Sequence, residues 1–295
     1  MLQEIVFQVA KRRVATFEPT ASSGASSRTS TAAYDEWRKC ALEEEFTHSF
    51  EADLVRDKDV LDFGCGSGAM SLLMNRLGAR SCIGIDLSEK SIETARAKVS
   101  GQAIEFRCAS DTTTIELKDA AVDRIVCFDV MEHIMDYEAI IGEWLRVLRP
   151  GGMVLIHWQP WFHPYGHHGH DYLPVPWVHV FLNHRKRTEL CARIVEMPEF
   201  NAPWWDYDKN NHRINRFRDA PTSESHAEKS GFLNELTMWR FERLCRTRGF
   251  TIARRTLVPF QGPAMVRAVS WGLSRLPLIR EFFTANAIYV LAKPN

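Results

Sequence analysis

Short apolar runs alternate with segments of helical periodicity along much of the chain. Apolar strands are predicted over residues 59–63, 81–85, 103–108, 124–128 and 153–157, with helices over 70–77, 88–99 and 136–148. Ser88 and Asp136 are typical N-cap residues, and Gly78 is a typical stop. The run Arg149-Pro150-Gly151-Gly152 is expected to end the third helix before the fifth strand. Such alternation predicts an α/β fold, a parallel sheet with helices on both faces.

The remaining segments indicate the domain organisation. Residues 1–33 are an N-terminal segment with a flexible linker of small polar residues, and Leu2–Val14 within it is a helix or a strand. Residues 34–160 form the predicted core and begin with a helix. Residues 161–228, rich in Trp, His and Pro, are interpreted as an insertion or lid. Residues 229–295 return to the core, with a helix capped by Thr237 and two further strands near residues 250–254 and 287–291.

Composition excludes several classes of protein. The chain is 45% hydrophobic and 25% charged, with a formal net charge of zero, so we expect no nucleic-acid or membrane partner of the kind that attracts a basic excess. The first residues lack the order of a secretory signal, and no stretch approaches the roughly 18 apolar residues of a membrane span. Its seven cysteines show no metal or disulfide spacing. We therefore expect a soluble cytoplasmic protein with reduced thiols.

Glycines at three alternate positions, Gly64, Gly66 and Gly68, end the first strand and open the first helix. Glycine allows a sharp turn and a close approach of the backbone to a ligand, and N–H groups at a helix start attract negative charge. Read permissively, the glycines together with Ala69 also satisfy the dinucleotide fingerprint. At this point an NAD-dependent enzyme remains an alternative.

Acidic residues near the strand ends favour another cofactor. Asp62, inside the first strand, suits a ligand with a positively charged amino-acid moiety and repels a pyrophosphate. Asp86 ends the second strand, where a carboxylate accepts hydrogen bonds from ribose hydroxyls of either cofactor. Asp111 follows the third strand, where it can accept from an adenine amino group. The long connection between the last two strands is also unlike a second mononucleotide-binding half.

These residues resemble the motifs of the class I S-adenosylmethionine-dependent methyltransferase family, in its small-molecule branch. The resemblance covers residues 59–156 and rests on VLDFGCGSG, IGIDLS, FDVMEHI and LRVLRPGGMVLI. It implies a Rossmann-like, seven-stranded, mostly parallel sheet whose last strand is antiparallel and pairs with the sixth. It further implies S-adenosylmethionine as the cofactor. The residues expected at the cofactor are Asp62, Gly64, Cys65, Gly66, Gly68, Asp86, Leu87, Ser110, Asp111 and Asp129.

Two histidines are candidates for the catalytic base. Methyl transfer is an in-line displacement, for which the protein supplies mainly alignment and exclusion of water. An oxygen acceptor also needs a base, and histidine is the natural choice. His133 follows the fourth strand, and His168 lies in a histidine-rich run in the insertion. The alternative is that His133 only packs against the cofactor and that the run lines a substrate pocket.

A divalent metal is a second interpretation of the same residues. Asp129, Glu132 and His133 present two carboxylates and an imidazole close together, and His168 would complete a site. The cluster resembles the Glu-x-x-Glu-His motif of ubiquinone-pathway and small-RNA methyltransferases that bind metal. Asp129 departs from that motif because its side chain is shorter.

The acceptor is not defined by the motifs. Tryptophans crowd the insertion, and aromatic walls suit a planar or sugar-like small molecule. The basic stretch 209–218 holds an anionic group of the substrate or is a solvated surface. The amphipathic stretch 261–283 covers the substrate side or forms a homodimer contact. We expect an O-methyltransferase of a small molecule, with a non-catalytic S-adenosylmethionine-binding protein and an NAD(P)-dependent oxidoreductase as alternatives.

Overall fold

The computed structural model describes residues 1–15, 31–167, 169, 172–198, 200, 206–207, 212–215, 217–218, 233–260 and 263–295, without the side chains of 14–15, 31–37, 206–207 and 213. The chain folds into two units. One unit comprises Met1–Tyr34 and Trp161–Leu233, and the other comprises Asp35–Pro160 and Asn234–Asn295. We call them the lid unit and the core unit. No helix among these residues has the length and apolar character that crossing a membrane requires.

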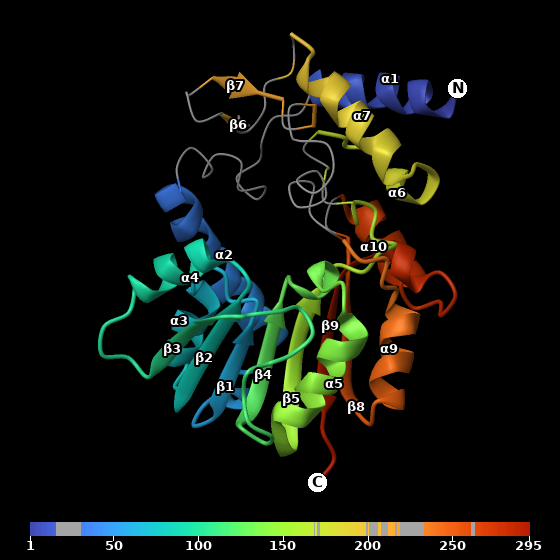
Figure 1. The fold of residues 1–295 in the computed structure, drawn as a ribbon. Coiled ribbons are helices and arrows are strands. Elements are labelled where there is room, and N and C mark those ends of the chain that lie inside the picture. The colour runs from blue at the N-terminus through green and yellow to red at the C-terminus, as the bar shows by residue number, and fades with distance from the viewer. Residues whose placement is uncertain are drawn as a thin grey trace. The chain divides into compact units, whose positions relative to one another are not determined.

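The core unit is built on one seven-stranded sheet (Figure 1). The spatial order of its strands is β3-β2-β1-β4-β5-β9-β8. The strands are β1 (Asp59–Phe63), β2 (Ser81–Asp86), β3 (Ile104–Cys108), β4 (Val122–Phe128), β5 (Leu148–Trp158), β8 (Thr251–Pro259) and β9 (Thr284–Ala292). The five strands from β3 to β5 pair in parallel, and β9 is antiparallel to both β5 and β8. The predicted fold class, antiparallel last strand included, is confirmed.

Helices connect the parallel strands and flank the sheet (Figure 1). They are α2 (Thr31–Ser49), α3 (Ala69–Arg76), α4 (Glu89–Arg96), α5 (Tyr137–Val147), α9 (Met238–Thr247) and α10 (Ala264–Leu273), with short 3-10 turns η3 (Ala52–Leu54), η4 (Met131–His133) and η5 (Arg280–Phe283). The side chains of Ser88 and Thr237 accept hydrogen bonds from the N–H groups of Ser91 and Arg240. Both therefore act as the N-caps that the sequence predicts.

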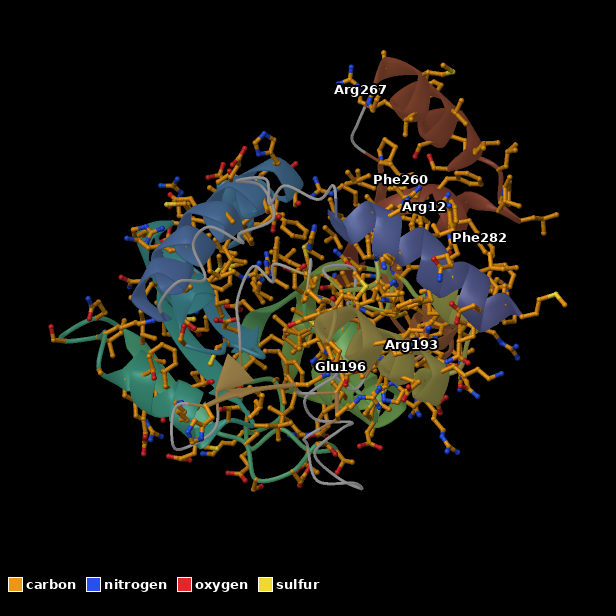
Figure 2. All side chains as sticks on the ribbon, turned by 90° about the horizontal axis from the view of Figure 1, so that it is seen from above. Arg12, Arg193, Glu196, Phe260, Arg267 and Phe282 are labelled. Carbon is orange, nitrogen blue, oxygen red and sulfur yellow. The ribbon has the colours of Figure 1, made fainter. Side chains whose placement is uncertain are left out.

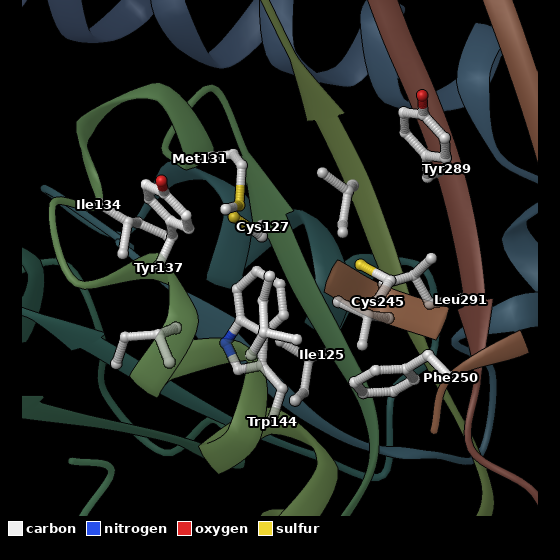
Figure 3. Close-up of a cluster of buried hydrophobic side chains, with 14 of the residues drawn as sticks. Ile125, Cys127, Met131, Ile134, Tyr137, Trp144, Cys245, Phe250, Tyr289 and Leu291 are labelled. Carbon is white, nitrogen blue, oxygen red and sulfur yellow. The ribbon is translucent and has the colours of Figure 1, made fainter. Parts of the chain in front are cut away.

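Each face of the sheet carries its own hydrophobic core, because neighbouring residues of a strand point to opposite faces. Leu61, Ile125 and Ile156 pack with Trp144 of α5 and with α9 on one face (Figure 3). Their neighbours along the strands, Val60, Val126 and Leu155, point to the other face. There they pack with helices α2 and α3, including Phe46 and Leu73. Burial on both faces explains why these strands read as continuous apolar runs.

Two local expectations differ from the structure. Strand β5 begins at Leu148, so the residues expected to form a turn belong to the strand. Leu148 pairs with Val122, and an irregularity in the register then accommodates Pro150 and the glycines. Asp136 precedes α5 as expected, but its side chain makes no cap hydrogen bond. Its carboxylate instead accepts a hydrogen bond from Thr112 at 2.6 Å.

In the lid unit, α1 (Leu2–Ala15) packs against α7 (His184–Val195), which resolves the open choice for the N-terminal segment in favour of a helix. Arg193 of α7 stacks on Phe7 at 3.7 Å and pairs with Glu4 at 3.0 Å; Figure 2 labels Arg193 on this helix. The unit also contains α6 (Val178–Phe181) and the strand pair β6 (Asp206–Tyr207) and β7 (Arg213–Ile214).

Candidate cofactor and active site

The glycine loop lies where the strand order reverses. Strand β1 has β2 on one side and β4 on the other, and the loop follows its carboxyl end at Gly64. In open α/β sheets, ligands bind in the crevice at this switch point. The N–H groups of Gly64 and Cys65 both donate to the Ile85 carbonyl, at 2.9 and 3.0 Å, which fixes the loop to the end of β2.

The loop is closely packed at one glycine and open at another. Gly64, Gly66 and Gly68 all have positive φ. A Cβ at Gly64 would lie 2.6 Å from the Val130 methyl groups, so only glycine fits there. Among the described residues, none has an atom within 4 Å of a Cβ placed at Gly66. As far as these residues go, the backbone at Gly66 faces open space, as a loop that receives a ligand must.

Asp86 holds this loop and faces the same opening. Its carboxylate oxygens accept hydrogen bonds from the N–H groups of Gly66 and Ser88, each at 2.9 Å. A carboxylate has about four lone-pair sites, so these two bonds leave room for ribose hydroxyls. The next residue, Leu87, is 59% exposed and offers apolar surface at the end of β2.

Asp62 lies beneath the loop rather than on its surface. Its side chain is only 1% exposed and accepts a hydrogen bond from the Ser71 hydroxyl of α3 at 2.5 Å. Burial raises the pKa of this carboxyl to about 7, and the negative charge of Asp86 adds to the rise while the Ser71 hydrogen bond opposes it. A positively charged ligand group near the loop would favour its ionised form.

Asp111 organises the turn after β3. Its carboxylate accepts hydrogen bonds from the N–H groups of Thr113 and Thr114, at 2.6 and 2.7 Å, and from both hydroxyls. The bond from the Thr114 hydroxyl contributes most to a pKa of about 2. Ser110 donates its hydroxyl to Glu116. Both side chains thus have partners within their own loop, and a direct role toward adenine stays a prediction.

A charged cluster that the sequence did not reveal lies at the carboxyl ends of β4 and β5. Asp129 accepts a hydrogen bond from Arg38 of α2 at 2.7 Å, and its other oxygen lies 2.7 Å from Nδ1 of His157. Burial tends to raise the pKa of Asp129, but the adjacent His157 and Arg38 outweigh burial and hold that pKa well below its usual range. His157 stacks on Phe128, with ring centroids 4.3 Å apart.

Arg38 carries no usable signal in the sequence, and His157 is predicted only as the end of the fifth strand and the start of the histidine-rich run. Arg38 lies 91 positions before its partner, in a helix whose polar face has no motif. His157 reaches Asp129 because strand register pairs it with Phe128, which adjoins Asp129. Asp129 also has a φ of 56°, a left-handed conformation that costs a non-glycine residue about 1 kcal/mol or more. Such strain is characteristic of functional positions.

The remaining candidates lie on or beyond the short turn η4. Glu132 is buried, and burial together with the charge of Asp129 raises its pKa to about 8. His133 is exposed. Asn234 holds this turn by donating to the carbonyls of Met131 and Ile134, both at 2.8 Å. His168 lies outside the described residues.

The structure does not gather the residues expected to bind metal. Within the described part of the chain, no group of three or more His, Cys, Asp or Glu side chains is arranged to hold a metal ion. Asp129 is engaged by Arg38 and His157 instead. A site completed by His168 stays untested.

Comparison with known proteins agrees with this geometry. Residues 61–156 match a family described as "Methyltransferase domain". Part of the chain also resembles two proteins named ubiquinone biosynthesis O-methyltransferase. That of Idiomarina loihiensis is 37% identical over 99 residues, and that of Neisseria meningitidis serogroup C is 41% identical over 106 residues. These matches cover 33% and 35% of this chain and only 40% and 44% of the relatives.

A solved structure extends the likeness of the fold. An S-adenosylmethionine-dependent methyltransferase from Mesorhizobium loti superposes with a TM-score of 0.51 at 18% identity, covering 88% of this chain and 98% of that one. Residues 61–156 of the core unit match a methyltransferase domain, as the motifs predict, and the core unit has the Rossmann-like fold of that solved structure.

Proposed function

We propose that this chain transfers a methyl group from S-adenosylmethionine to an oxygen atom of a small-molecule acceptor. The observation that carries the proposal is the open loop at the switch point. At Gly66 the backbone faces space that no described residue fills, and the Asp86 carboxylate beside it can accept further hydrogen bonds. The methyltransferase match over residues 61–156 includes both residues.

The residues around this opening fit the cofactor. Asp86 would accept from the ribose hydroxyls, with Leu87 beside the sugar or base. The glycines and Cys65 would border the methionine part, and Asp62 would stabilise its ammonium group from beneath the loop. Ser110 and Asp111 would border the adenine. When bound, the cofactor supplies a sulfonium methyl group with a good leaving group.

The chain's own contribution is positioning and removal of a proton. Alignment of an acceptor with the methyl group, in a site closed to water, accounts for most of the acceleration of such a displacement. His133 and His168 are the proposed bases for the acceptor hydroxyl. Asp129 stays anionic because Arg38 and His157 hold it so, and a negative charge four residues before His133 would favour the imidazolium that proton transfer creates there.

The relatives support oxygen as the acceptor atom, since both are named O-methyltransferases. The matches span only about two fifths of the relatives' length. The acceptor is therefore inferred only as a class, a phenol or sugar hydroxyl of a small molecule, handled in the cytoplasm where the cofactor is made.

Calorimetry tests the cofactor directly. We expect the protein to bind S-adenosylmethionine and S-adenosylhomocysteine but not NAD. We expect Asp86→Asn to weaken binding at least tenfold, because hydrogen bonds to a charged group are the stronger ones. Absence of binding by both sulfur compounds would overturn the proposal. Binding without methyl transfer to any hydroxyl acceptor in a panel would favour the non-catalytic alternative.

Single substitutions test the two histidines. His133→Ala and His168→Ala should each leave cofactor affinity unchanged, and loss of the base should lower kcat about 100-fold or more. Unchanged kcat in both variants would remove the imidazole base from the mechanism. His48→Ala, an exposed histidine of α2, is the matched control and should behave as wild type.

We leave a metal out of the mechanism because a guanidinium already occupies Asp129, and a divalent cation there would face its positive charge. Elemental analysis before and after chelator treatment tests this choice. A bound metal whose removal abolishes acceptor turnover would restore the metal centre.

A further inference from the structure

Helix α10 turns its polar side inward and its apolar side outward. The buried residues of this helix and the turn after it are Ser270 and Ser274, which are 2% and 5% exposed. The Ser270 hydroxyl donates to the Phe283 carbonyl at 2.8 Å and accepts from the Phe260 N–H at 2.9 Å. Hydrogen bonds to the ends of β8 and η5, rather than buried apolar surface, therefore hold the helix to the core unit.

The outward side of this helix and the turn after it are rich in exposed apolar side chains. Their large side chains are more than a third exposed, and they are Met265, Val266, Val269, Trp271, Leu276, Leu278 and Ile279. Scattered exposed apolar residues are ordinary. Seven of them within residues 265–279, on one helix and its following turn, are characteristic of a binding surface. We call residues 264–279 the α10 surface.

The charges on this surface are of one sign. Residues 263–280 contain three arginines and no Asp or Glu. Arg280 pairs with the buried Glu242 at 2.9 Å, which leaves Arg267 and Arg275 on the outside; Figure 2 shows Arg267 on α10. A symmetric contact with a second copy would bring these cations together, whereas a negatively charged surface would complement them.

The aromatic residue and its neighbour are suited to a boundary between water and lipid. The Arg275 guanidinium lies 3.3 Å from the centroid of the Trp271 ring. Tryptophan and arginine both keep one end polar while burying an apolar body, and both are common at the headgroup level of membranes. The helix has ten residues, about 15 Å, which is half a bilayer core. It is therefore suited to lie along a membrane surface.

We propose that the α10 surface binds the protein peripherally to a membrane that contains anionic lipids. Val266, Val269 and Trp271 enter the headgroup boundary, and Arg267 and Arg275 meet the lipid phosphates and carboxylates. This departs from the absence of membrane contact that the composition predicts, because a neutral net charge conceals a local basic and apolar patch.

Co-sedimentation with vesicles tests the proposal. The full chain should bind vesicles of phosphatidylcholine mixed with phosphatidylserine, bind phosphatidylcholine alone much less, and lose binding as salt increases. The double variant V266S/V269S should reduce the partition coefficient at least tenfold. Arg267→Gln and Arg275→Gln should each reduce it about fivefold.

The lid unit offers a matched control. Ile5 and Val9 of α1 are 56% and 39% exposed, comparable with Val266 and Val269 at 45% and 51%. The variant I5S/V9S should bind vesicles as wild type does. Circular dichroism and S-adenosylmethionine binding should be unchanged in both double variants, because the substituted side chains are exposed.

Three outcomes would overturn the proposal. The first is that the wild-type chain does not bind phosphatidylserine vesicles. The second is that I5S/V9S loses vesicle binding while V266S/V269S keeps it. The third is that vesicle binding is absent and sedimentation without lipid shows a dimer that V266S/V269S dissociates; the α10 surface is then a contact between two copies.

Discussion

The buried carboxyl of Asp62 should make the protein less stable as pH rises. It is 1% exposed, with a pKa of about 7 against 3.8 when solvated. Below pH 4 both the folded and the unfolded states hold its proton, and above pH 7 both are ionised. Between these limits the folded state binds more protons, so stability falls with increasing pH. The shift of about three pH units corresponds to about 4 kcal/mol at 1.36 kcal/mol per unit.

Asp62→Asn removes the free-energy cost of ionising this buried carboxyl while preserving the shape of the side chain. The amide oxygen can still accept the Ser71 hydrogen bond. The gain in the free energy of unfolding over wild type should therefore rise from near zero at pH 4 to about 4 kcal/mol at pH 8. Urea unfolding at a series of pH values measures it from the midpoint and slope.

Glu93→Gln is the control for this prediction. Glu93 is exposed on α4, so Glu93→Gln should show no comparable pH-dependent gain. If Asp62→Asn is no more stable than wild type at pH 8, the carboxyl is not costly and the argument from burial fails. The same variant should bind S-adenosylmethionine more weakly at pH 8, because a charge near the ammonium group is lost. Gain of stability with loss of affinity is the expected compromise at a binding site.

Two further substitutions, each with a matched control, separate structure from function. Gly66→Ala should cost about 1 kcal/mol of folding free energy, from its positive φ, but lower S-adenosylmethionine affinity at least tenfold in calorimetry. Gly101→Ala, which also has positive φ and no atom within 4 Å of its Cβ, should cost the same stability and leave affinity unchanged. Arg38→Met should destabilise the protein by about 1 to 3 kcal/mol in urea unfolding, because it strips a cation from the partly buried Asp129. Arg56→Met breaks an exposed ion pair and should change stability by less than about 1 kcal/mol; equal losses in the two variants would contradict the assigned role of Arg38.

Sequence predicted those parts of the fold that depend on local periodicity. Strands buried on both faces and the buried stripe of α5 follow from residue type alone, and so do the caps Ser88 and Thr237. Strand β5 starts earlier than predicted because pairing of Leu148 with Val122 outweighs the turn preference of Pro150 and the glycines. Tertiary hydrogen bonding likewise decides the orientation of α10, which periodicity would have turned the other way.

The candidate site likewise has a part that the sequence predicts and a part that it does not. The proposed cofactor residues were predictable from the sequence, because each glycine and acid lies next to a strand end. The cluster at Asp129 joins α2, β4 and β5 through side chains 28 and 91 positions apart. No local pattern predicts those contacts, yet they fix the charge of a carboxylate at the carboxyl end of β4. Proteins that share the glycine loop can thus differ in acid–base chemistry through residues as distant as Arg38. The acceptor-side chemistry should therefore be sought in the residues packed around Asp129 rather than in the motifs that bind the cofactor.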